Sequence, residues 1–471
     1  MAPYWANRSC DPFGARDEAC VKGTYLQYAV QVESVSDITR TVQFAGSRNL
    51  RLVIRNTGHD YFGKSTGAGA IGLWMHKMNG FDAIDFNSSY YNGKAVRVAA
   101  GALSADTTAK AHQHGLAIVG GNCPSVGLAG GYTQGGGLGP LTSRYGLAAD
   151  QVLEWNVVTV NGTLVKATPE QNTQLYWALS GGGGGTFGVV VSMTVKAYPE
   201  ERTASANLTF SSAGVPAQTF FDILETFHSC LPTLSKAGGT AIYNIQQTGF
   251  ALIPATLPGQ GKDSLDSMLD PVITKLKSFN ITYVYASIEA NTYFDAYEKM
   301  NPPSETSYFQ IGGRVLPQHA LNDNYGQLMQ SLKDILDYGA GIGGLSYHVP
   351  ESGDGRFNNS VNPRLRSGAL SLTIGTVWDD INWTLDIANQ ELMTEVLIPA
   401  VDRLDPTQRT SYLNEADFRE QQWQEVFYGE SYRKLLHVKQ MYDFQNLLWG
   451  RTAVGSETWL ERNDGKLCRS F

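Results

Sequence analysis

The chain has 471 residues, of which 42% are hydrophobic and 17% are charged, and its 36 Lys plus Arg against 44 Asp plus Glu give a net charge of −8. This length suits two or three domains, the composition excludes an intrinsically disordered chain, and an acidic balance without a basic block disfavours nucleic acid and anionic membranes as partners. Glycine is the outlier, because its 50 residues gather in a few loops. Such loops indicate backbone that comes close to a ligand or to another segment.

Five cysteines and an excess of N-x-S/T sequons point to an oxidising compartment. The spacing allows one disulfide between Cys10 and Cys20, and a second pair is Cys230 with Cys468. If both pairs form, Cys123 is the thiol left over. No run of 18 apolar residues predicts a membrane span. We expect a secreted glycoprotein whose signal peptide is absent from this sequence; the alternative is a cytosolic protein with buried thiols. The sequons are at Asn7, Asn87, Asn161, Asn207, Asn280, Asn358 and Asn382.

Helix and strand patterns alternate in the first part of the chain. The first helix, over 34–49, is expected to begin at Ser36 or Asp37 and to bury Ile38, Val42 and Ala45. Residues 121–139 carry too many glycines for regular structure and predict a loop. The other predicted elements here are a strand over 50–56, a helix over 103–115 and a strand over 116–121.

A hairpin and a long strand follow the glycine-rich loop. Strands over 152–160 and 163–167 are joined by Asn161-Gly162, a strong two-residue hairpin signal. A helix is predicted from Thr168-Pro169 to residue 180. The glycine run 181–185 then leads into a strand over 188–199.

From residue 201 the pattern changes to long β-prone runs that alternate with longer amphipathic helices. This texture predicts an antiparallel sheet covered by helices, and the tail from about 410 is expected to return to the first domain. The strands are predicted over 204–210, 240–247, 281–290 and 369–378. The helices are predicted over 216–231, 264–279, 324–339 and 387–404.

Several familiar chemistries are excluded by the order or spacing of the residues. The run GGGGGTFG at 181–188 follows a helix and precedes a strand, which is the reverse of a dinucleotide-binding fingerprint. The chain has no P-loop and no G-x-S-x-G nucleophile motif. His112 and His114 are two residues apart and point away from each other on a helix, so no metal site is predicted.

Four ordered motifs carry a specific resemblance. They are R-x-x-G-H-D at 55–60, G-x-C-P-x-V-G-x-x-G-G-x-x-x-G-G-G-x-G at 121–139, S-R-Y-G-L-A-A-D at 143–150, and L-Y-W-A-L-S-G-G-G-G-G-T-F-G-V-V at 175–190. Together they resemble the FAD-linked oxidases of the vanillyl-alcohol oxidase fold, in particular the secreted fungal members of the berberine-bridge-enzyme-like branch. The resemblance covers about 50–200 and resumes in the tail.

The resemblance implies a bicovalent FAD. By position, His59 would bond to the 8α carbon of the flavin and Cys123 to its ring carbon 6, which in the family raises the reduction potential. It implies that Val126, three residues after Cys123, sets oxygen access as in the oxidase members. It also places the following residues near the pyrophosphate, ribose or adenine: Arg55, Asn56, Thr57, Gly58, Asp60, Gly127, Gly130, Gly131, Gly136, Gly137, Tyr145, Gly146, Asp150, Gly188 and Val189.

The tail resembles the family segment that closes the flavin site. MYDFQNLLW places Tyr442 and Asn446 against FAD, although Phe444 stands where the family has proline. Relatives read A-Y-x-N-Y with a catalytic tyrosine, whereas this chain reads S-Y-L-N-E and has Glu415 at that position. Relatives also carry Glu or Gln on a central strand of the second domain, where this chain offers Thr373 or Ile374. The catalytic candidates are therefore Glu415, whose pKa burial would raise, and Tyr412, Tyr347 and His348.

The sequence thus predicts an α+β flavoprotein. A two-subdomain FAD-binding domain of the PCMH type is expected over 1–200, a substrate domain over 201–409, and a returning segment over 410–471. Hydride would pass from an alcohol-type or carbohydrate-type C–H to FAD, and O2 would then give hydrogen peroxide. The partners are a small-molecule substrate and O2, with no nucleic acid or membrane, and the protein is expected to be a monomer.

The alternatives are a dehydrogenase with poor O2 reactivity and a secreted protein that retains flavin without turnover. Aromatic side chains that could stack on a substrate ring are Trp378, Trp383, Tyr283 and Tyr285.

Overall fold

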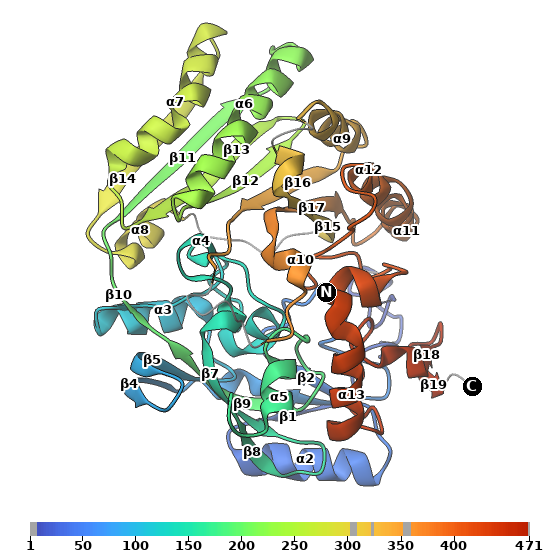
Figure 1. Ribbon diagram of the computed structural model, residues 1–471. Helices are drawn as coiled ribbons and strands as arrows, with labels where there is room; N and C mark the ends of the chain where they lie inside the picture. The colour runs from blue at the N-terminus through green and yellow to red at the C-terminus, as the bar shows by residue number, and fades with distance from the viewer. Residues whose placement is uncertain (1–6, 302–308, 322–324, 352–358, 470–471) are drawn as a thin grey trace.

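The computed structural model describes residues 7–301, 309–321, 325–351 and 359–469. Figure 1 shows two lobes, one above the other. We call residues 26–199 together with 410–469 the lower lobe, and residues 203–402 the upper lobe. The mixed helix and sheet content agrees with the predicted α+β class. No helix within the described residues is long and apolar enough to cross a membrane.

The lower lobe contains a small parallel sheet and a larger antiparallel one. The parallel sheet has the order β1-β3-β2, and the five-stranded sheet has the order β4-β5-β9-β7-β8. The predicted hairpin at Asn161-Gly162 is confirmed, since it joins β7 to β8. The strands are β1 (Tyr28–Gln31), β2 (Leu52–Arg55), β3 (Ile71–Trp74), β4 (Phe81–Asn87), β5 (Asn92–Ala99), β6 (Leu116–Ala117), β7 (Val152–Val158), β8 (Leu164–Ala167), β9 (Val189–Lys196) and β10 (Tyr198–Pro199).

The first helix buries the predicted face but begins earlier than predicted. Helix α2 (Val35–Ser47) buries Ile38, Val42 and Ala45. Its N-cap is Ser34 rather than Ser36 or Asp37, because Asp37 is the third helical residue and its carboxylate accepts from the Ser34 backbone N–H in a capping box. The remaining helices here are α3 (Ser104–Gln113), α4 (Thr142–Tyr145) and α5 (Thr173–Leu179), which starts later than Thr168.

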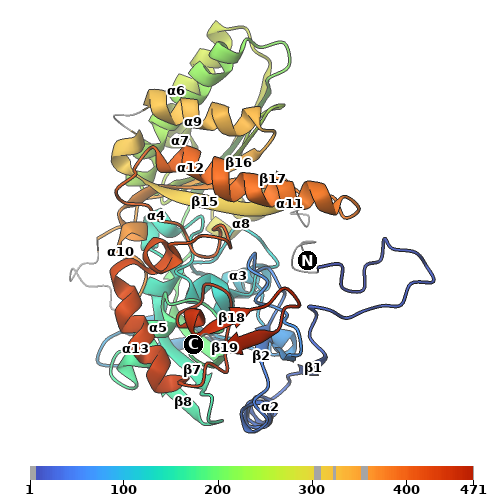
Figure 2. The same ribbon diagram turned by 90° about the vertical axis from the view of Figure 1, so that its right-hand side faces the viewer.

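The upper lobe is built on a seven-stranded antiparallel sheet in the order β14-β11-β13-β12-β16-β17-β15. Helices cover one face of this sheet, and the opposite face is turned toward the lower lobe (Figures 1 and 2). The strands are β11 (Thr203–Ser211), β12 (Thr240–Gln246), β13 (Gly249–Pro258), β14 (Tyr283–Ala290), β15 (Phe309–Pro317), β16 (Gly341–Ser346) and β17 (Gly368–Val377). The helices are α6 (Ala217–Lys236), α7 (Lys262–Ser278), α8 (Tyr293–Met300), α9 (Tyr325–Asp337), α10 (Pro363–Arg366), α11 (Trp383–Leu392) and α12 (Ile398–Asp402).

The tail packs into the core of the lower lobe, where Leu413, Phe427 and Leu435 join the residues of the first two hundred positions. Its elements are α13 (Tyr432–Tyr442), β18 (Trp459–Glu461) and β19 (Leu467–Arg469). A buried ion pair on α13 fixes this docking. Lys439 Nζ donates to Asp443, to the Thr186 carbonyl at 2.8 Å and to the Leu448 carbonyl at 2.7 Å, which ties the tail to the 181–188 glycine segment.

One of the two predicted disulfides is wrong. Cys10 and Cys20 are bonded. Cys230 is a buried free thiol on α6, whereas Cys468 is exposed on β19 in the other lobe, so these two cannot meet. Cys123 is therefore not the one unpaired cysteine, because Cys230 and Cys468 are free thiols as well. A role for Cys123 cannot rest on the number of cysteines.

Candidate functional site

Two loops of the lower lobe bring His59 and Cys123 to one point. The first loop follows β2, and the second follows β6. His59 Nε2 lies 2.8 Å from Ser125 Oγ, and Cys123 Sγ lies 3.8 Å from the same oxygen. The His59 side chain is exposed and that of Cys123 is half-buried, so both are reachable from outside. Partial burial of the ring lowers the pKa of His59, so the imidazole is neutral at neutral pH.

Asn56 fixes the first loop to neighbouring segments and lies close to Gly127 of the second loop. Its Nδ2 donates to the Ala100 carbonyl at 3.2 Å, and its Oδ1 lies 3.1 Å from His76 Nδ1. An added Cβ at Gly127 would overlap Asn56 Nδ2, so only glycine permits this approach. Asp60 shapes the other end of the loop by accepting from the backbone N–H groups of Lys64 at 2.6 Å and Ser65 at 3.1 Å. The motif residues around His59 therefore serve first to build the loop.

Glycine backbone forms the floor beside these loops. Residues 128–132 make one π-helical turn with a kink at Gly130, where the sequence predicted no regular structure. Gly131 is exposed, and an added Cβ at Gly130 would point into open space. An added Cβ at Gly184 would lie 2.8 Å from Gly131 Cα, so the two glycine segments are packed backbone to backbone. Their N–H and C=O groups thus line an accessible surface that a Cβ would fill.

A third segment, residues 411–420, brings carboxylate and phenol groups to the same place. Asn414 Nδ2 donates to the Gly131 carbonyl at 3.0 Å and to the Tyr412 hydroxyl at 2.8 Å, which ties this segment to the glycine floor. Burial raises the pKa of Glu415 to about 7, although its side chain keeps partial access to solvent. Burial, and then the charge of Glu415, raise the pKa of Tyr61 and of Tyr412.

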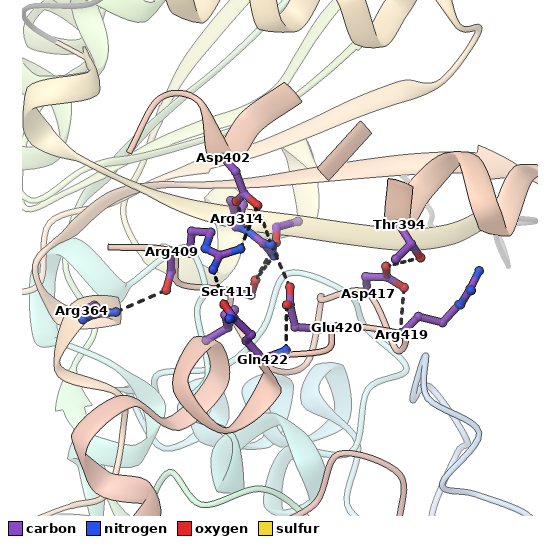
Figure 3. Close-up of polar contacts among 12 residues, drawn as sticks. Arg314, Arg364, Thr394, Asp402, Arg409, Ser411, Asp417, Arg419, Glu420 and Gln422 are labelled. Atoms are coloured by element: carbon purple, nitrogen blue, oxygen red, sulfur yellow. Dashed lines mark hydrogen bonds and ion pairs between the residues drawn. The ribbon is translucent and has the colours of Figure 1, made fainter. Parts of the chain in front are cut away.

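The upper lobe holds this segment through a buried arginine on β15. Arg314 donates to Asp402 at 2.5 and 3.2 Å, to Glu420 at 2.8 Å and to Ser411 Oγ at 2.9 Å. Figure 3 shows the guanidinium of Arg314 between these groups, with Asp417 fixed separately by Thr394 at 2.7 Å. The backbone around Glu415 is therefore clamped at both ends.

Residues paired across four neighbouring strands form a row that leads away from Glu415. The row lies on the open face of the upper sheet, which is the face without helices that is turned toward the lower lobe (Figures 1 and 2). In register, Asn244 pairs with Gly343, Gly343 with Thr373, and Thr373 with Gly313. An added Cβ at Gly313 would lie 2.9 Å from the Glu415 carbonyl oxygen, so the row ends against the backbone of Glu415. Thr373 lies on this face, whereas Ile374 is fully buried on the helix side. Sequence reasoning missed Asn244 and Gly343, whose only signal was glycine recurring every second residue in 341–343.

Two of the four catalytic candidates, Tyr347 and His348, do not join His59 and Cys123. Tyr347 is 1% exposed, and its hydroxyl donates to the Leu365 carbonyl at 2.6 Å, a bond that already uses its proton. His348 is exposed, and its backbone N–H donates to Ser143 Oγ at 3.1 Å. The structure thus brings Glu415 and Tyr412 to the two loops and adds Tyr61, which the sequence reading did not single out although it lies two residues after His59.

The residues predicted near the far end of the cofactor are mostly engaged with protein groups. The Asp150 carboxylate accepts from Arg366 at 2.6 and 2.9 Å and from Asn359 at 2.7 Å, and Tyr145 stacks on Tyr198 with ring centroids 3.8 Å apart. The others lie as follows: Arg55 beside Gly58, Thr57 half-buried in the first loop, Val126 accepting from Ser104 N, Gly136 and Gly137 at positive φ, Gly146 at positive φ, Gly188 against Val157, Val189 buried, Tyr442 half-buried and Asn446 donating to Thr458.

The residues present fit a flavin. Three side-chain polar atoms beside Cys123 and the glycine floor are buried without a partner among the described residues, namely Asn122 Oδ1, Tyr132 Oη and Gln134 Oε1. A buried polar atom left without a hydrogen bond is costly, so such atoms mark where a polar ligand edge is expected. An accessible glycine floor, a neutral imidazole and a thiol at one point supply the remaining chemistry. His59, Cys123 and the backbone of 128–131 would hold the group.

The aromatic residues considered for substrate stacking are structural or peripheral. The Tyr285 hydroxyl donates to Asp266 on α7 at 2.5 Å, and Tyr283 packs against the same helix-side core. Trp383 lies under the guanidinium of Arg8, 5.7 Å from the ring centroid. Trp378 lines a surface hollow with Phe13 and Ile381.

Comparison with known proteins agrees with these features. A family model described as FAD binding domain matches residues 26–168, and one described as berberine and berberine like matches residues 411–455. The chain is 50% identical over 469 residues to the FAD-linked oxidoreductase sor8 of Hypocrea jecorina, covering 100% of this chain and 81% of that protein.

Two solved structures extend the comparison. The VAO-type flavoprotein MtVAO615 of Myceliophthora thermophila C1 has a TM-score of 0.93 and 36% identity, covering 100% of this chain and 87% of that one. A glucooligosaccharide oxidase of Acremonium strictum, described as carrying 6-S-cysteinyl, 8α-N1-histidyl FAD, has a TM-score of 0.74 and 19% identity, covering 92% and 94% of the two chains. This second likeness concerns the fold alone.

Proposed function

The chain belongs to the FAD-linked oxidoreductases of the berberine-bridge-enzyme-like branch, with the vanillyl-alcohol oxidase fold, and from that premise we propose that it is an oxidase with a bicovalent flavin. The substrate is an alcohol-type or carbohydrate-type small molecule. When bound, FAD would accept a hydride from the substrate and pass the electrons to O2, which yields hydrogen peroxide. The observation that carries the proposal is the meeting of His59 and Cys123 at Ser125 Oγ.

Attachment through His59 and Cys123 is supported by the state of both side chains. The hydrogen bond between Ser125 and His59 Nε2 leaves Nδ1 as the ring nitrogen for the flavin, and the lowered pKa favours the neutral ring; Nδ1 is unprotonated in the tautomer whose Nε2–H donates to Ser125 Oγ. The glucooligosaccharide oxidase of similar fold is described with the same two residue types on its FAD. Cys123 lies on a loop held on both sides, which limits the directions in which its sulfur can point.

Proton removal from the substrate is assigned to Glu415. A carboxylate whose pKa is about 7 is matched to general-base work near neutral pH. Tyr61 and Tyr412 keep their protons there because burial and the Glu415 charge raise their pKa, so they act as hydrogen-bond donors to the substrate oxygen. We propose that the rest of the substrate lies along the row from Gly313 to Asn244, where Thr373 and Asn244 supply polar groups.

The proposal extends to the environment of the enzyme. The Cys10–Cys20 disulfide supports a secreted protein. We take Val126, half-buried beside the Cys123 loop, as the residue that controls oxygen access. The enzyme is proposed to act as a monomer, with a small-molecule substrate and O2 as its partners.

Two measurements test the proposed function. First, the purified protein is denatured in acid and filtered; yellow colour should remain with the polypeptide and be lost only from the His59→Ala, Cys123→Ala double variant. Free flavin from the unaltered protein would contradict double attachment.

Second, a panel of primary alcohols, secondary alcohols and oligosaccharides is added under nitrogen. At least one should bleach the flavin absorbance, and air should restore the colour within seconds with release of hydrogen peroxide. Restoration over many minutes would indicate a dehydrogenase, and no bleaching at all a protein without turnover.

A further inference from the structure

The Cys123 loop is held by a helix of the other lobe. The backbone carbonyl of Asn122, the residue before Cys123, accepts from the Tyr297 hydroxyl at 2.9 Å and from Asn301 Nδ2 at 3.2 Å. Tyr297 lies on α8, and Asn301 caps the end of that helix. Both bonds therefore cross from the upper lobe to the loop that carries the thiol.

Helix α8 is itself rigidly placed. Its N-terminus is anchored by Glu200, which accepts from the Tyr293 N–H at 2.9 Å, and its last residue accepts at the Met300 carbonyl from Asn207 at 2.9 Å. Phe294 stacks on His112 of α3 with ring centroids 4.6 Å apart. Because α8 is fixed at both ends and along one side, it can hold the neighbouring loop in one position.

Both lobes hold this loop: Ser104 and Ala105 of the lower lobe donate to the carbonyls of Gly121, Pro124 and Val126, and α8 of the upper lobe donates to the Asn122 carbonyl. Ser125 bonds to His59 inside the lower lobe, whereas the Asn122 carbonyl accepts from two side chains of the upper lobe. Burial raises the pKa of Tyr297, which keeps its hydroxyl protonated as a hydrogen-bond donor. Removing the α8 bonds would loosen the residue directly before Cys123, whereas the Ser104 bond to the Gly121 carbonyl and the bond between Ser125 and His59 would remain.

We propose that Tyr297 and Asn301 are positioning residues for the bond between Cys123 and the flavin, so that this second attachment requires the upper lobe while the His59 attachment does not. The inference rests on the proposed bicovalent flavin. Overall, one S–C6 bond forms while the thiol S–H and the ring C6–H bonds break. The two electrons and two protons released reduce one O2 to hydrogen peroxide.

The test uses full-length protein with His59 replaced by alanine, in which Cys123 is the sole attachment. Apoprotein is mixed with FAD in air, and covalent flavin is followed with time by fluorescence of the denatured chain on a gel. Tyr297→Phe with Asn301→Ala should slow this attachment about tenfold, as expected for the loss of two hydrogen bonds of ordinary strength. In the Cys123→Ala background the same pair of substitutions should leave the His59 attachment unchanged.

A matched control is Tyr91→Phe, since the Tyr91 hydroxyl also donates to a backbone carbonyl, that of Lys94, at 2.9 Å, but on an exposed hairpin. Equal attachment rates with and without the α8 substitutions would overturn the inference, and so would an equal slowing of the His59 attachment, which would indicate general damage. The single Tyr297→Phe variant, which keeps the ring, should show a smaller slowing in the same direction. If the His59→Ala protein never acquires covalent flavin, the double linkage itself fails, and this result is distinct from an unchanged rate.

Discussion

The guanidinium of Arg314 lies 2.8 Å from the carboxylate of Glu420, and this bond joins a strand of the upper sheet to the segment that carries Glu415. Arg314 is 4% exposed and also pairs with Asp402, which has a second, longer ion pair with Arg409 at 3.8 Å. A buried charge that loses its partner is costly, whereas the intact group is nearly neutral in its effect on stability. The contact therefore matters less as a source of stability than as a constraint on where Glu415 lies.

Arg314→Met should destabilise the protein by about 3 to 5 kcal/mol, because Glu420 would lose its buried cation and Asp402 would keep only the longer ion pair with Arg409 among the described residues. Arg314→Lys should recover part of this loss, since one ammonium can pair with only some of the oxygens that the guanidinium reaches. Thermal unfolding at a fixed concentration measures both. Arg403→Met is the control, because its ion pair with Asp334 is exposed and should contribute little. Equal losses for Arg314→Met and the control would contradict this account.

Glu415→Gln should lower the rate of flavin bleaching by the best substrate of the panel by about 10²- to 10⁴-fold, the usual contribution of a general base. In the unaltered enzyme that rate should rise with pH through about 7, where Glu415 loses its proton, and this limb should vanish in the variant. The stability effect has the opposite sign. The raised pKa means that Glu415 costs stability as pH rises from its unfolded value through about 7, so the glutamine variant should be the more stable protein above pH 7.

A control for this substitution lies further along the tail. Glu425 has an exposed carboxylate and only a long ion pair with Arg364 at 3.5 Å, so Glu425→Gln should leave both the rate and its pH dependence unchanged. A pH limb that persisted in the Glu415→Gln enzyme would assign the base to another group, with Tyr61 and Tyr412 as the nearest alternatives.

Lys439→Met should be more harmful than replacing both members of its pair. Lys439 and Asp443 are buried, and the aspartate also accepts from the backbone N–H groups of Leu447 and Leu448, each at 2.9 Å. The single substitution leaves a buried carboxylate without its cation and should cost about 3 to 5 kcal/mol. Adding Asp443→Asn, which keeps an acceptor for those N–H groups, should restore part of it. Additive losses in denaturant unfolding would show that the two residues act independently.

The sequence was informative where local chemistry decides the structure. The α2 face at Ile38, Val42 and Ala45 follows from helical spacing, and the Asn161-Gly162 turn follows from the backbone preference of those two residues. The helix start was misplaced because Ser34 and Ser36 are both good caps, and only the partner at Asp37 distinguishes them. The strands β15 and β16 were not predicted, since their glycines lower strand propensity and tertiary pairing forms them nonetheless.

The site was predictable only in part for a similar reason. His59 and Cys123 stand in motifs, so a resemblance located them, and the fold then placed Ser125 between them. The contact from Tyr297 to Asn122 joins residues 175 positions apart, and no local pattern signals it. Thr373 was considered as a lone substitute for a missing acid, but its role as one member of a row with Asn244 depends on strand register, which a single sequence does not reveal.

His228 predicts a loss of stability in acid. It is fully buried between the Leu224 carbonyl at 2.7 Å and the Tyr243 hydroxyl at 2.9 Å, and burial lowers its pKa to about 4. The unfolded chain binds a proton near pH 6.5, so the stability that this residue contributes is present above that pH and is lost as pH falls toward 4, by about 3 kcal/mol in total. His228→Gln should flatten the fall in melting temperature between pH 6.5 and 4; an unchanged slope would exclude His228 as its source.

Gly343→Val should reduce substrate oxidation while sparing the flavin. An added Cβ at Gly343 would overlap the Thr373 hydroxyl and lie 3.5 Å from the Asn244 side chain, so valine would fill the row that leads away from Glu415. The residue faces the open side of the sheet, away from the helix-side core formed by Ile342 and Ile374, and a β-branched side chain suits a strand. Folding and covalent flavin content should therefore be kept. Because the side chain blocks binding rather than proton transfer, KM for a long substrate should rise at least about tenfold, with a smaller effect on a short alcohol that reaches only Glu415.

Gly339→Ala, at a turn where an added Cβ meets no neighbour, serves as a control for stability, because its positive φ strains the backbone without touching the row. Equal KM values for Gly343→Val and the unaltered enzyme on every substrate of the panel would show that substrates do not lie along this face.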